Sequence, residues 1–475
     1  MTVVGVAYLV VLGLLAVYGL HRAHLVYLYL RHRACDTAGP TRRFTEPPIV
    51  TVQLPLYNER YVSERLIDAV ARLRWPVDRL EIQVLDDSTD ETSAICARKV
   101  ADLRERGFDA KHLQRPGRAG FKAGALEHGL ASARGELLLV FDADFVPGPD
   151  VLERAVDLFT DERVAMVQLR WDHLNRSYSL LTATQALLLD AHFVVEHGAR
   201  FRSGRFFNFS GTAGLWRKAA IVDAGGWQHD TLTEDMDLSY RAQLRGWRFV
   251  FLEDSTVPAE LPVEMSAFKS QQFRWAKGQM QVARKLLPAV LASDLPLRVK
   301  LEAFFHLTNN VAYALLLLVC VLALPNLWAW RAPAVVDGPL FAGASLAMAV
   351  FYALSQRGVA GGPLHALVRL PCVMALCAGL AVNQARAVVE ALVGRESDFV
   401  RTPKHGVVAR RQRWANLDYR GARSLTSVAE ILLFGYCLVA AALAAAVGHW
   451  LTVPFLVIFS LGFGYVGALS WWQTR

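Results

Sequence analysis

Long apolar runs stand near both ends of the chain. The first covers residues 3–20, contains no charged residue and is long enough to cross a bilayer. Positive charges follow this run at Arg22, Arg31 and Arg33, whereas a cleavable signal peptide carries its positive charge in front of the apolar run. By the positive-inside rule, the side that follows the run is cytoplasmic. We therefore expect a retained transmembrane helix over residues 1–22, with the N-terminus outside.

The C-terminal part of the chain, residues 301–475, has the pattern of a second membrane region. Its apolar segments are 301–325, 337–356, 364–393, 427–448 and 451–472. The loop 394–426 is strongly basic, which places it in the cytoplasm. The globular middle of the chain also ends in the cytoplasm, so an even number of membrane crossings must lie between its end and the basic loop. Three apolar segments lie there, so one of them does not span the membrane. Polar residues interrupt 364–393, so we expect an interfacial or re-entrant helix there and about four spanning helices elsewhere.

Between the membrane regions, residues 45–295 hold most of the charge and alternate strand signals with helix signals. The short apolar runs typical of buried strands are 49–54, 81–85, 136–141, 164–169 and 248–252. An amphipathic helix follows the first run, with Leu66, Ile67, Val70 and Leu73 on one face. This alternation predicts an α/β domain with a doubly wound, mostly parallel sheet, next to an α-helical transmembrane region.

Composition narrows the choice of partners. Hydrophobic residues make up 53% of the 475 positions, which excludes a disordered chain. The net charge of +8 is typical of proteins that meet nucleic acid or anionic lipid. Because the basic residues cluster beside apolar segments, we expect membrane lipids and no nucleic acid as partners. The six cysteines form no CxxC pair, so they indicate buried thiols in a reducing compartment rather than a disulfide framework or a zinc site.

Acidic side chains follow two of the predicted strands. Asp86 and Asp87 follow the second strand, and Asp142 and Asp144 follow the third. In an open parallel sheet, ligands bind beyond the carboxyl ends of the strands. Carboxylates in D-x-D spacing suit a divalent cation that neutralises phosphate oxygens. A single D-x-D is a weak signal, because such acids also cap helices or stay solvated, but two clusters at equivalent strand ends favour a functional site.

A third acidic group, Thr233-Glu234-Asp235, leaves two interpretations open. Thr231 and Glu234 have the spacing of a capping box, and acids in a first turn suit the helix dipole. Alternatively, one of these carboxylates is a general base, which rigid structure must place beside the reacting hydroxyl.

Residues 266–287 have the pattern of an amphipathic helix with Gln271, Arg274 and Trp275 on one face. An Arg can grip a diphosphate, and a Trp offers a flat surface to a sugar ring. A basic helix lying on the membrane surface is the alternative. Lys122 lies in a glycine-rich segment and could balance a phosphate charge, although a single lysine is more often solvated. The segment has no GxGxxG dinucleotide fingerprint.

Four motifs occur in order: VLDDSTD at 84–90, DAD at 142–144, TED at 233–235 and QQFRW at 271–275. Together they resemble the motif set of family 2 glycosyltransferases of the GT-A fold, in the membrane-embedded cellulose-synthase superfamily. The last motif matches the Q-x-x-R-W signature of processive β-glycan synthases. Longer stretches resemble the cellulose-synthase-like A group, the (gluco)mannan synthases, and their bacterial relatives. Residues 399–404 resemble the gating-loop motif F-x-V-T-x-K, except that Arg401 stands where Val is usual.

The resemblance implies roles for the matching residues. The catalytic candidates are Asp235 as general base, with Glu234 and Thr233 beside it. The candidates for nucleotide-sugar binding are Asp86, Asp87, Lys122, Asp142, Arg274, Thr402 and Lys404. Gln271 and Trp275 would hold the acceptor, and Asp142 and Asp144 would bind Mg²⁺ or Mn²⁺.

The implied activity is inverting transfer of a hexose from UDP-glucose or GDP-mannose to a growing β-glycan, processive and with export through the membrane. The candidate channel-lining residues are Asn309, Asn310, Tyr313, Tyr352, Asn383 and Gln384, for which helix–helix hydrogen bonding is the alternative. Two other functions stay open: transfer of one or a few sugars to a membrane lipid, and a non-catalytic transporter or scaffold. We expect a multi-pass protein of the cell (inner) membrane with a cytoplasmic catalytic domain, and protein partners stay unknown.

Overall fold

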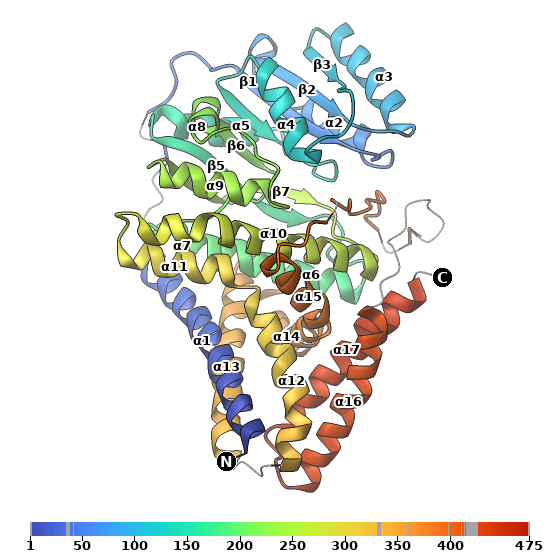
Figure 1. The fold of residues 1–475 in the computed structure, drawn as a ribbon. Helices are drawn as coiled ribbons and strands as arrows, with labels where there is room; N and C mark the ends of the chain where they lie inside the picture. Colours follow the sequence, from blue (N-terminus) through green and yellow to red (C-terminus); the bar gives the residue numbers. More distant parts are fainter. Residues whose placement is uncertain are drawn as a thin grey trace.

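The chain forms two stacked parts, a sheet domain and a bundle of apolar helices (Figure 1). This computed structural model describes residues 2–34, 39–40, 42–329, 334–359, 361–397, 399–409, 411–412, 414 and 426–473. Part of the predicted loop 394–426 lies outside these residues. The N-terminus lies at the end of the bundle far from the sheet, and the last helix ends beside the junction of the two parts (Figure 1).

A seven-stranded sheet forms the centre of the sheet domain. Its strands are β1 (Val50–Leu56), β2 (Leu80–Asp86), β3 (Asp109–Leu113), β4 (Leu137–Val140), β5 (Val164–His173), β6 (Gly214–Arg217) and β7 (Arg248–Ala259). They lie in the order β3-β2-β1-β4-β6-β5-β7. All neighbours run parallel except β6, which is antiparallel to β4 and β5. The predicted doubly wound, mostly parallel sheet is therefore confirmed.

The five apolar runs of the sequence all lie in strands, because a strand of a sheet covered on both faces is buried on both sides. Two strands were not predicted. β3 is an edge strand whose residues include Asp109, Lys111 and His112, so it has no apolar run. β6 has only four residues, too few for a periodic signal.

Helices cover both faces of the sheet. They are α2 (Ser63–Val70), α3 (Thr92–Glu105), α4 (Phe121–Ser132), α5 (Val151–Ala155), α8 (Lys218–Asp223) and α9 (Glu234–Leu244), with 3-10 turns η1 (Val77–Arg79) and η2 (Val156–Thr160). α2 is the predicted amphipathic helix, and its Leu66 and Ile67 are fully buried. Side chains alternate between two apolar cores, so Leu139 of β4 enters one and Leu138 enters the other.

A layer of helices separates the sheet from the bundle (Figure 1). It comprises α6 (Leu180–Ala191), the π-helix η3 (His192–His197), α7 (Gly198–Arg202), α10 (Met265–Ala292), α11 (Leu297–Thr308) and α15 (Ala381–Leu392). The predicted amphipathic helix 266–287 lies within α10. One side of this layer therefore faces the sheet domain and the other faces the apolar bundle.

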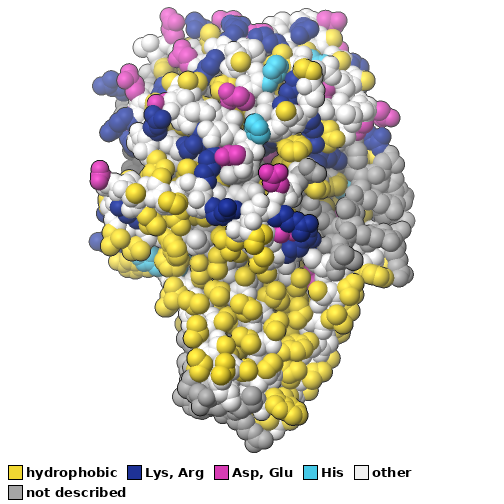
Figure 2. Space-filling model, in the orientation of Figure 1, with side chains coloured by type: hydrophobic (Ala, Val, Ile, Leu, Met, Phe, Trp, Pro, Cys, Tyr) yellow, Lys and Arg dark blue, Asp and Glu magenta, His cyan; other side chains and the backbone are white. Residues whose placement is uncertain are grey.

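The bundle contains the longest apolar helices. They are α1 (Val3–Arg31), α12 (Val311–Ala329), α13 (Ala334–Ser355), α14 (Gly362–Gly379), α16 (Thr426–Ala446) and α17 (Val453–Gln473). Among the described residues, five segments are long and apolar enough to cross a membrane: 3–31, 311–328, 362–392, 426–446 and 453–473. Hydrophobic side chains cover the bundle, and Lys and Arg side chains gather where it meets the sheet domain (Figure 2).

Three predicted membrane segments have different bounds in the structure. The helix expected over residues 1–22 continues to Arg31, because its last turns pack against the helix layer, where Tyr29 and Ala199 share an apolar cluster. The segment 301–325 divides into α11 and α12. α11 carries Glu302, whose buried carboxylate accepts hydrogen bonds from polar groups, so it is not a uniformly apolar helix.

The segment 364–393 also divides, at a turn around Leu380 that separates α14 from α15. Leu380 packs on Phe268 near the start of α10. Further on, Val388 packs on Met280 in the middle of α10. By length and composition alone the combined segment 362–392 could cross a membrane. Its second helix nevertheless lies along α10, at the junction of the two parts.

Candidate active site

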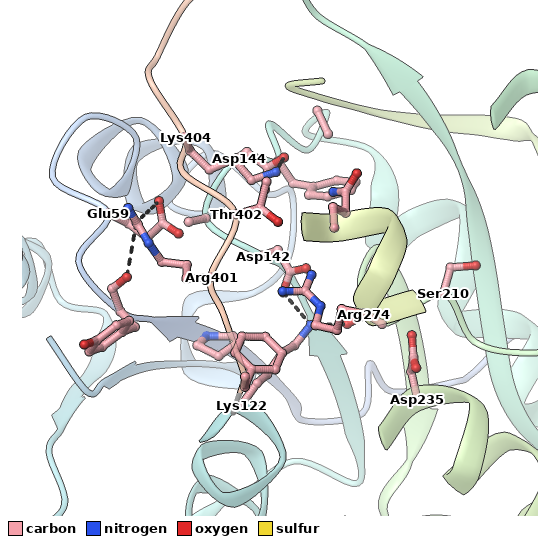
Figure 3. Close-up of a pocket in the computed structure, with 18 of the residues that line it drawn as sticks. Glu59, Lys122, Asp142, Asp144, Ser210, Asp235, Arg274, Arg401, Thr402 and Lys404 are labelled. Atoms are coloured by element: carbon pink, nitrogen blue, oxygen red, sulfur yellow. Dashed lines mark hydrogen bonds and ion pairs between the residues drawn. The ribbon is translucent and has the colours of Figure 1, made fainter. Parts of the chain in front are cut away.

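A pocket of about 160 Å³ opens at the carboxyl ends of the central strands β1 and β4 (Figure 3). Every predicted site residue except Asp86 lines it, namely Asp87, Lys122, Asp142, Asp144, Thr233, Glu234, Asp235, Gln271, Arg274, Trp275, Thr402 and Lys404. These residues come from strand ends, from the starts of α4 and α9, from α10 and from the segment after α15. The fold therefore gathers motifs separated by more than 300 residues into one cavity.

Asp86 is the exception because its carboxylate is buried and hydrogen-bonded inside the domain. It is the last residue of β2, and its carboxylate accepts hydrogen bonds from Nε2 of His112 (2.8 Å) and from the backbone N of Ser88 (2.9 Å). Burial opposes its ionisation, but these hydrogen bonds outweigh burial and lower the pKa of Asp86 to about 2. Asp86 therefore does not line this pocket, and its contact with a nucleotide stays a prediction. Its neighbour Asp87 reaches the pocket wall, where Arg115 donates two hydrogen bonds to it (2.8 and 2.6 Å).

Lys122 lies between the acidic groups rather than in solvent. Its Nζ is 2.6 Å from Oδ1 of Asp142 and 3.8 Å from Oε1 of Glu234, and it donates to the carbonyl of Gly211 (2.9 Å). Burial alone would lower the pKa of Lys122, but Asp142 and Glu234 outweigh burial and raise it. The pocket therefore contains a fixed cation, and the alternative of a solvated lysine is wrong.

Asp235 lies in the first turn of α9 and faces the pocket (Figure 3). Burial, followed by the negative charge of Glu234, raises the pKa of Asp235 to about 7. Space in front of the carboxylate is kept open by Gly211, which has φ +83°, and a Cβ there would lie 2.8 Å from Oδ2 of Asp235. A carboxylate with this pKa on an open wall is suited to accept a proton.

A second glycine brings α10 against the acidic group. A Cβ at Gly278 would lie 2.5 Å from Cγ2 of Thr233, so only glycine allows this approach. Thr233 is the N-cap residue of α9 but makes no side-chain capping hydrogen bond. The capping box that the spacing of Thr231 and Glu234 allowed is therefore not formed. The acidic group lines the pocket instead.

α10 places its three signature residues along the pocket, as their spacing predicted. Gln271 and Trp275 also line a larger cavity on the side of the bundle. The centres of the Trp275 and Trp171 rings are 6.4 Å apart. Arg274 reaches toward the segment that follows α15. Its Nη1 donates to the carbonyl of Val400 (3.1 Å), and its guanidinium lies 4.4 Å from the centre of the Phe399 ring.

The segment 399–406 contains the gating-type motif and crosses the pocket beside Arg274 (Figure 3). Nη1 of Arg401 is 3.0 Å from Oε2 of Glu59, and it also donates to the carbonyls of Tyr57 and Asn58. Arg401, the residue that departs from the motif, thus ties this segment to the loop after β1.

Two further contacts hold the same segment. Nζ of Lys404 is 2.6 Å from Oδ2 of Asp144. The backbone N of Gly406 donates to Oε2 of Glu260 (3.1 Å). Together with Arg401, these contacts attach the segment to three carboxylates that line the pocket.

Several hydroxyl groups on the pocket wall lack a hydrogen-bond partner among the described residues. They belong to Thr402, Thr233 and Ser210. A buried polar atom without a partner is costly in a folded protein. These hydroxyls therefore indicate that a polar ligand completes the site.

Asp142 and Asp144 fit the outline of a divalent metal site. No group of three His, Cys, Asp or Glu side chains that could hold a metal occurs in the described part of the chain. Mg²⁺ commonly takes only one or two carboxylates and fills its other positions with phosphate oxygens and water. Each carboxylate already attracts a cation, Lys122 at Asp142 and Lys404 at Asp144. The donor chemistry of the pair therefore suits a metal ion that a phosphorylated ligand shares.

Sequence reasoning missed part of the pocket wall. Glu59, Tyr57 and Arg118 line it, and the Arg118 guanidinium lies 3.3 Å from the centre of the Tyr57 ring. Burial raises the pKa of Glu59 to about 8, although Arg401 acts in the opposite direction. The signal was present, since Glu59 follows the first predicted strand as Asp87 follows the second.

The larger cavity, of about 450 Å³, adjoins the pocket and extends into the bundle. Asp235, Gln271 and Trp275 line both spaces, so the two cavities adjoin at these residues. Of the candidate channel residues, Asn309, Asn310, Tyr313 and Gln384 line the cavity. Tyr352 and Asn383 do not. Asn383 donates to the carbonyl of Lys269 (2.9 Å), which is the helix–helix hydrogen bonding that was the alternative.

Comparisons with known proteins agree with this geometry. The family model described as "Glycosyltransferase like family 2" matches residues 47–278. Glucomannan 4-beta-mannosyltransferase 7 of Arabidopsis thaliana is 33% identical over 437 residues, which cover 88% of this chain and 77% of that protein. Glucomannan 4-beta-mannosyltransferase 2 of the same plant is 44% identical over 249 residues, 51% of this chain and 47% of that protein. The chain thus spans about half the length of several curated relatives that it matches.

Among solved structures, the mannosyltransferase PcManGT from Pyrobaculum calidifontis, in complex with GDP-Man and Mn²⁺, has a similar fold. The TM-score is 0.53 at 22% identity, covering 82% of this chain and 99% of that chain. The sheet order, the gathered motifs and these similarities lead to one assignment. The chain belongs to the family 2 glycosyltransferases, in the cellulose-synthase-like group that includes the glucomannan 4-β-mannosyltransferases.

Proposed function

We propose that the protein transfers a hexose from a nucleotide-diphosphate sugar to the end of a β-glycan that grows toward the membrane. The observation that carries this proposal is that Asp235 and Trp275 line both cavities. A donor at the strand ends and an acceptor in the bundle-side cavity would meet there, on opposite sides of one carboxylate. GDP-mannose and UDP-glucose are the donors to test, and the glucomannan mannosyltransferase relatives favour mannose.

Asp235 acts as the general base in this proposal. Its carboxylate takes the proton of the acceptor hydroxyl while that oxygen forms a bond to the anomeric carbon of the donor. The bond from the anomeric carbon to the diphosphate oxygen breaks at the same time, and the nucleoside diphosphate leaves. Because attack and departure occur on opposite faces, the configuration at the anomeric carbon inverts, which gives a β-linkage from an α-linked donor.

Three cations of the pocket wall would stabilise the departing diphosphate. They are Lys122 and Lys404, whose present partners are Asp142 and Asp144, and Arg274 on α10. Fixed charges of this kind need no rearrangement while negative charge develops on the leaving group. A Mg²⁺ or Mn²⁺ ion held by Asp142 and Asp144 would add Lewis-acid stabilisation of the same diphosphate. Trp275 would stack on the terminal acceptor sugar and fix its hydroxyl for attack.

The arrangement of the helices supports a membrane topology. We propose that α1, α12, α13, α16 and α17 cross the cell (inner) membrane, that α14 and α15 stay at its cytoplasmic surface, and that the sheet domain is cytoplasmic. The positive side chains at the junction support this orientation (Figure 2). With five crossings the N-terminus lies outside and the basic loop 394–426 lies inside.

A donor panel tests the proposed function. The purified full-length protein in lipid nanodiscs is incubated with Mn²⁺ and, separately, with labelled GDP-mannose, UDP-glucose and UDP-N-acetylglucosamine. We expect one or both hexose donors to yield a ladder of glycans that grows with time. A single labelled species that extracts with lipid would instead show transfer to a membrane lipid. Release of nucleoside diphosphate from none of the donors would contradict the proposal and favour a non-catalytic scaffold.

Arg401→Val, which restores the usual residue of the gating motif, is expected to raise the KM for the donor about tenfold, since a charged hydrogen-bond donor to the buried carboxyl group of Glu59 is lost. Arg401 holds the segment 399–406 closed through Glu59, so its loss should lower the closed population without altering the reacting groups. Steady-state kinetics at varied donor concentration measure this. The kcat should stay within about twofold, since Asp235 is untouched. An unchanged donor KM would show that the Arg401–Glu59 contact does not contribute to closure.

A further inference from the structure

The bundle-side cavity has a charged wall that the proposed mechanism does not use. Arg22 of α1 and His192 and Glu196 of η3 line it. Nη1 of Arg22 is 3.0 Å from Oε1 of Glu196, and Oε2 of Glu196 is 3.0 Å from Nδ1 of His192. We infer that these three residues, the charged collar, bind the hydroxyl groups of the inner sugars of a neutral hexose acceptor. The inference rests on the proposed function, because it concerns the acceptor of that reaction.

The location of the charged collar fits an acceptor that is already several sugars long. Trp275 and Gln271 line the cavity at the reacting end, and the charged collar lines it together with Asn309 and Asn310. The sugar next to Asp235 lies at the pocket, so the sugars behind it must occupy this cavity. A cavity of about 450 Å³ has the size of an ordinary ligand site.

The charged collar keeps polar groups open to the cavity. The Arg22 and His192 side chains retain 27% and 32% of their exposure although they lie between helices, and both line this cavity. The guanidinium has five N–H donors, and its one described hydrogen bond is to Glu196. Its flat face lies 4.8 Å from the centre of the Phe351 ring, which fixes the orientation of the group. N–H donors and a carboxylate side by side match the adjacent hydroxyls of a hexose.

A second set of ion pairs lies behind the charged collar. Arg200 bridges Glu196 (3.5 Å) and Glu302 (2.9 Å), and Oε2 of Glu302 is 3.0 Å from Nε2 of His21. Neither Arg200 nor Glu302 lines the cavity. Burying such charges costs more than a hydrophobic replacement would, so stability alone does not explain the network. π-Helical turns such as η3 occur often at functional sites.

Charge balance favours a neutral ligand. The positive charge of Arg22 stands beside the negative charge of Glu196, so a phosphate group entering the cavity would meet a carboxylate as well as a guanidinium. The hydroxyls of a sugar can accept hydrogen bonds from the guanidinium and donate them to the carboxylate, and the sugar itself carries no net charge. Trp171, which is only partly buried, lines the same wall and offers an aromatic face to a sugar ring.

The test uses the full-length protein in nanodiscs with the hexose donor that is active in the donor panel. The acceptors are β-1,4-linked manno- and gluco-oligosaccharides of one to four units. We expect the acceptor KM to fall as the acceptor grows from one to three sugars. In Arg22→Met/Glu196→Gln, which removes both charges together, the trisaccharide KM should rise about tenfold, as for loss of hydrogen bonds to charged groups. The donor KM and the kcat at saturating acceptor should stay within about twofold.

Two further variants separate binding from folding. His192→Ala, which changes the most exposed member of the charged collar, should raise the trisaccharide KM in the same direction. Glu302→Gln perturbs the supporting ion pairs without touching the cavity, so it should lower the thermal unfolding midpoint and leave the dependence on acceptor length intact. If Glu302→Gln abolishes the length dependence to the same extent as the collar variants, or if no collar variant changes it, the inference is wrong.

Calorimetric titration of the trisaccharide, without donor, gives a readout that does not need turnover. Binding to the wild type that is weakened about tenfold in the double variant supports the charged collar. Absence of binding to the wild type overturns the inference even if the donor panel shows transfer. Absence of transfer in the donor panel overturns the proposed function instead, so the two failures are distinguishable.

Discussion

Replacing Asp235 by Asn is expected to reduce kcat about 10²–10⁴-fold, the usual contribution of a general base. The amide keeps the size of the side chain and can still accept from the backbone N of Met236, so α9 should stay folded. It cannot take the proton of the acceptor hydroxyl. Initial rates at saturating donor and acceptor measure the effect, and an unchanged donor KM would show that the donor site is intact. Transfer that persists within about tenfold would mean that another group is the base.

The pH dependence gives an independent view of the same carboxylate. Burial and the charge of Glu234 raise the pKa of Asp235 to about 7. The base works only when ionised, so kcat/KM should be level above pH 7 and fall about tenfold for each unit below it. Glu234→Gln is the matched control. It removes one negative neighbour, so the acidic limb should move to lower pH while the plateau is largely kept. A pH profile that Glu234→Gln leaves in place would contradict this assignment.

Removal of divalent metal is expected to lower turnover by about 10³-fold or more, since a Lewis acid at a leaving diphosphate is worth several kcal/mol. Among the described residues, the carboxylate of Asp142 pairs with Lys122 and that of Asp144 pairs with Lys404. These two lysines remain when metal is chelated, so some donor binding should persist. Activity is measured after chelation and again after Mg²⁺ or Mn²⁺ is restored. Activity that survives chelation would remove the metal role of both aspartates.

Variants then show which carboxylates hold the metal. Asp142→Asn and Asp144→Asn should each raise the metal concentration needed for half-maximal activity at least about tenfold, because each removes one ligand. Glu260→Gln is the matched control, since Glu260 lines the same pocket but pairs with Arg65 (2.7 Å). Its metal requirement should stay unchanged. An equal shift in all three variants would point to a general electrostatic effect of the pocket.

The sequence predicted the site better than it predicted single contacts. The sequence predicted that the acids after the central strands lie together, because parallel strands end at one edge of a sheet. It also predicted that Arg274 and Trp275 lie on one face of their helix. Asp86 and Asp87 show the limit of this reasoning. Both follow the same strand, but only the pattern of hydrogen bonds to His112 and Ser88 decides which carboxylate is turned inward.

Lys122 and Arg401 were undervalued for a similar physical reason. The energy of a cation depends on which anions surround it, and those anions come from distant parts of the chain. Lys122 meets Asp142 and Glu234, and Arg401 meets Glu59, more than 300 residues earlier. The local sequence pattern does not predict such long-range ion pairs. It does predict the strands, because their apolar runs are local.

The sequence predicted which segments of the membrane region are apolar, but it did not predict where the helices end. Apolar composition predicts how much chain can enter a bilayer, but helix ends depend on tertiary packing. α1 continues past residue 22 because the helix layer between the sheet and the bundle covers its last turns. The segment 301–325 divides next to Asn309 and Asn310, where polar side chains meet the cavity.

The linkage formed in the donor panel tests the central claim most directly, namely that a single carboxylate, Asp235, drives one displacement at the anomeric carbon. The product of the active α-linked donor is purified, and the coupling between the anomeric proton and carbon is measured by NMR. The account predicts a β-linked hexose as the only product of the wild type. An α-linked product would require two displacements or attack from the face of the leaving group, and would contradict the account.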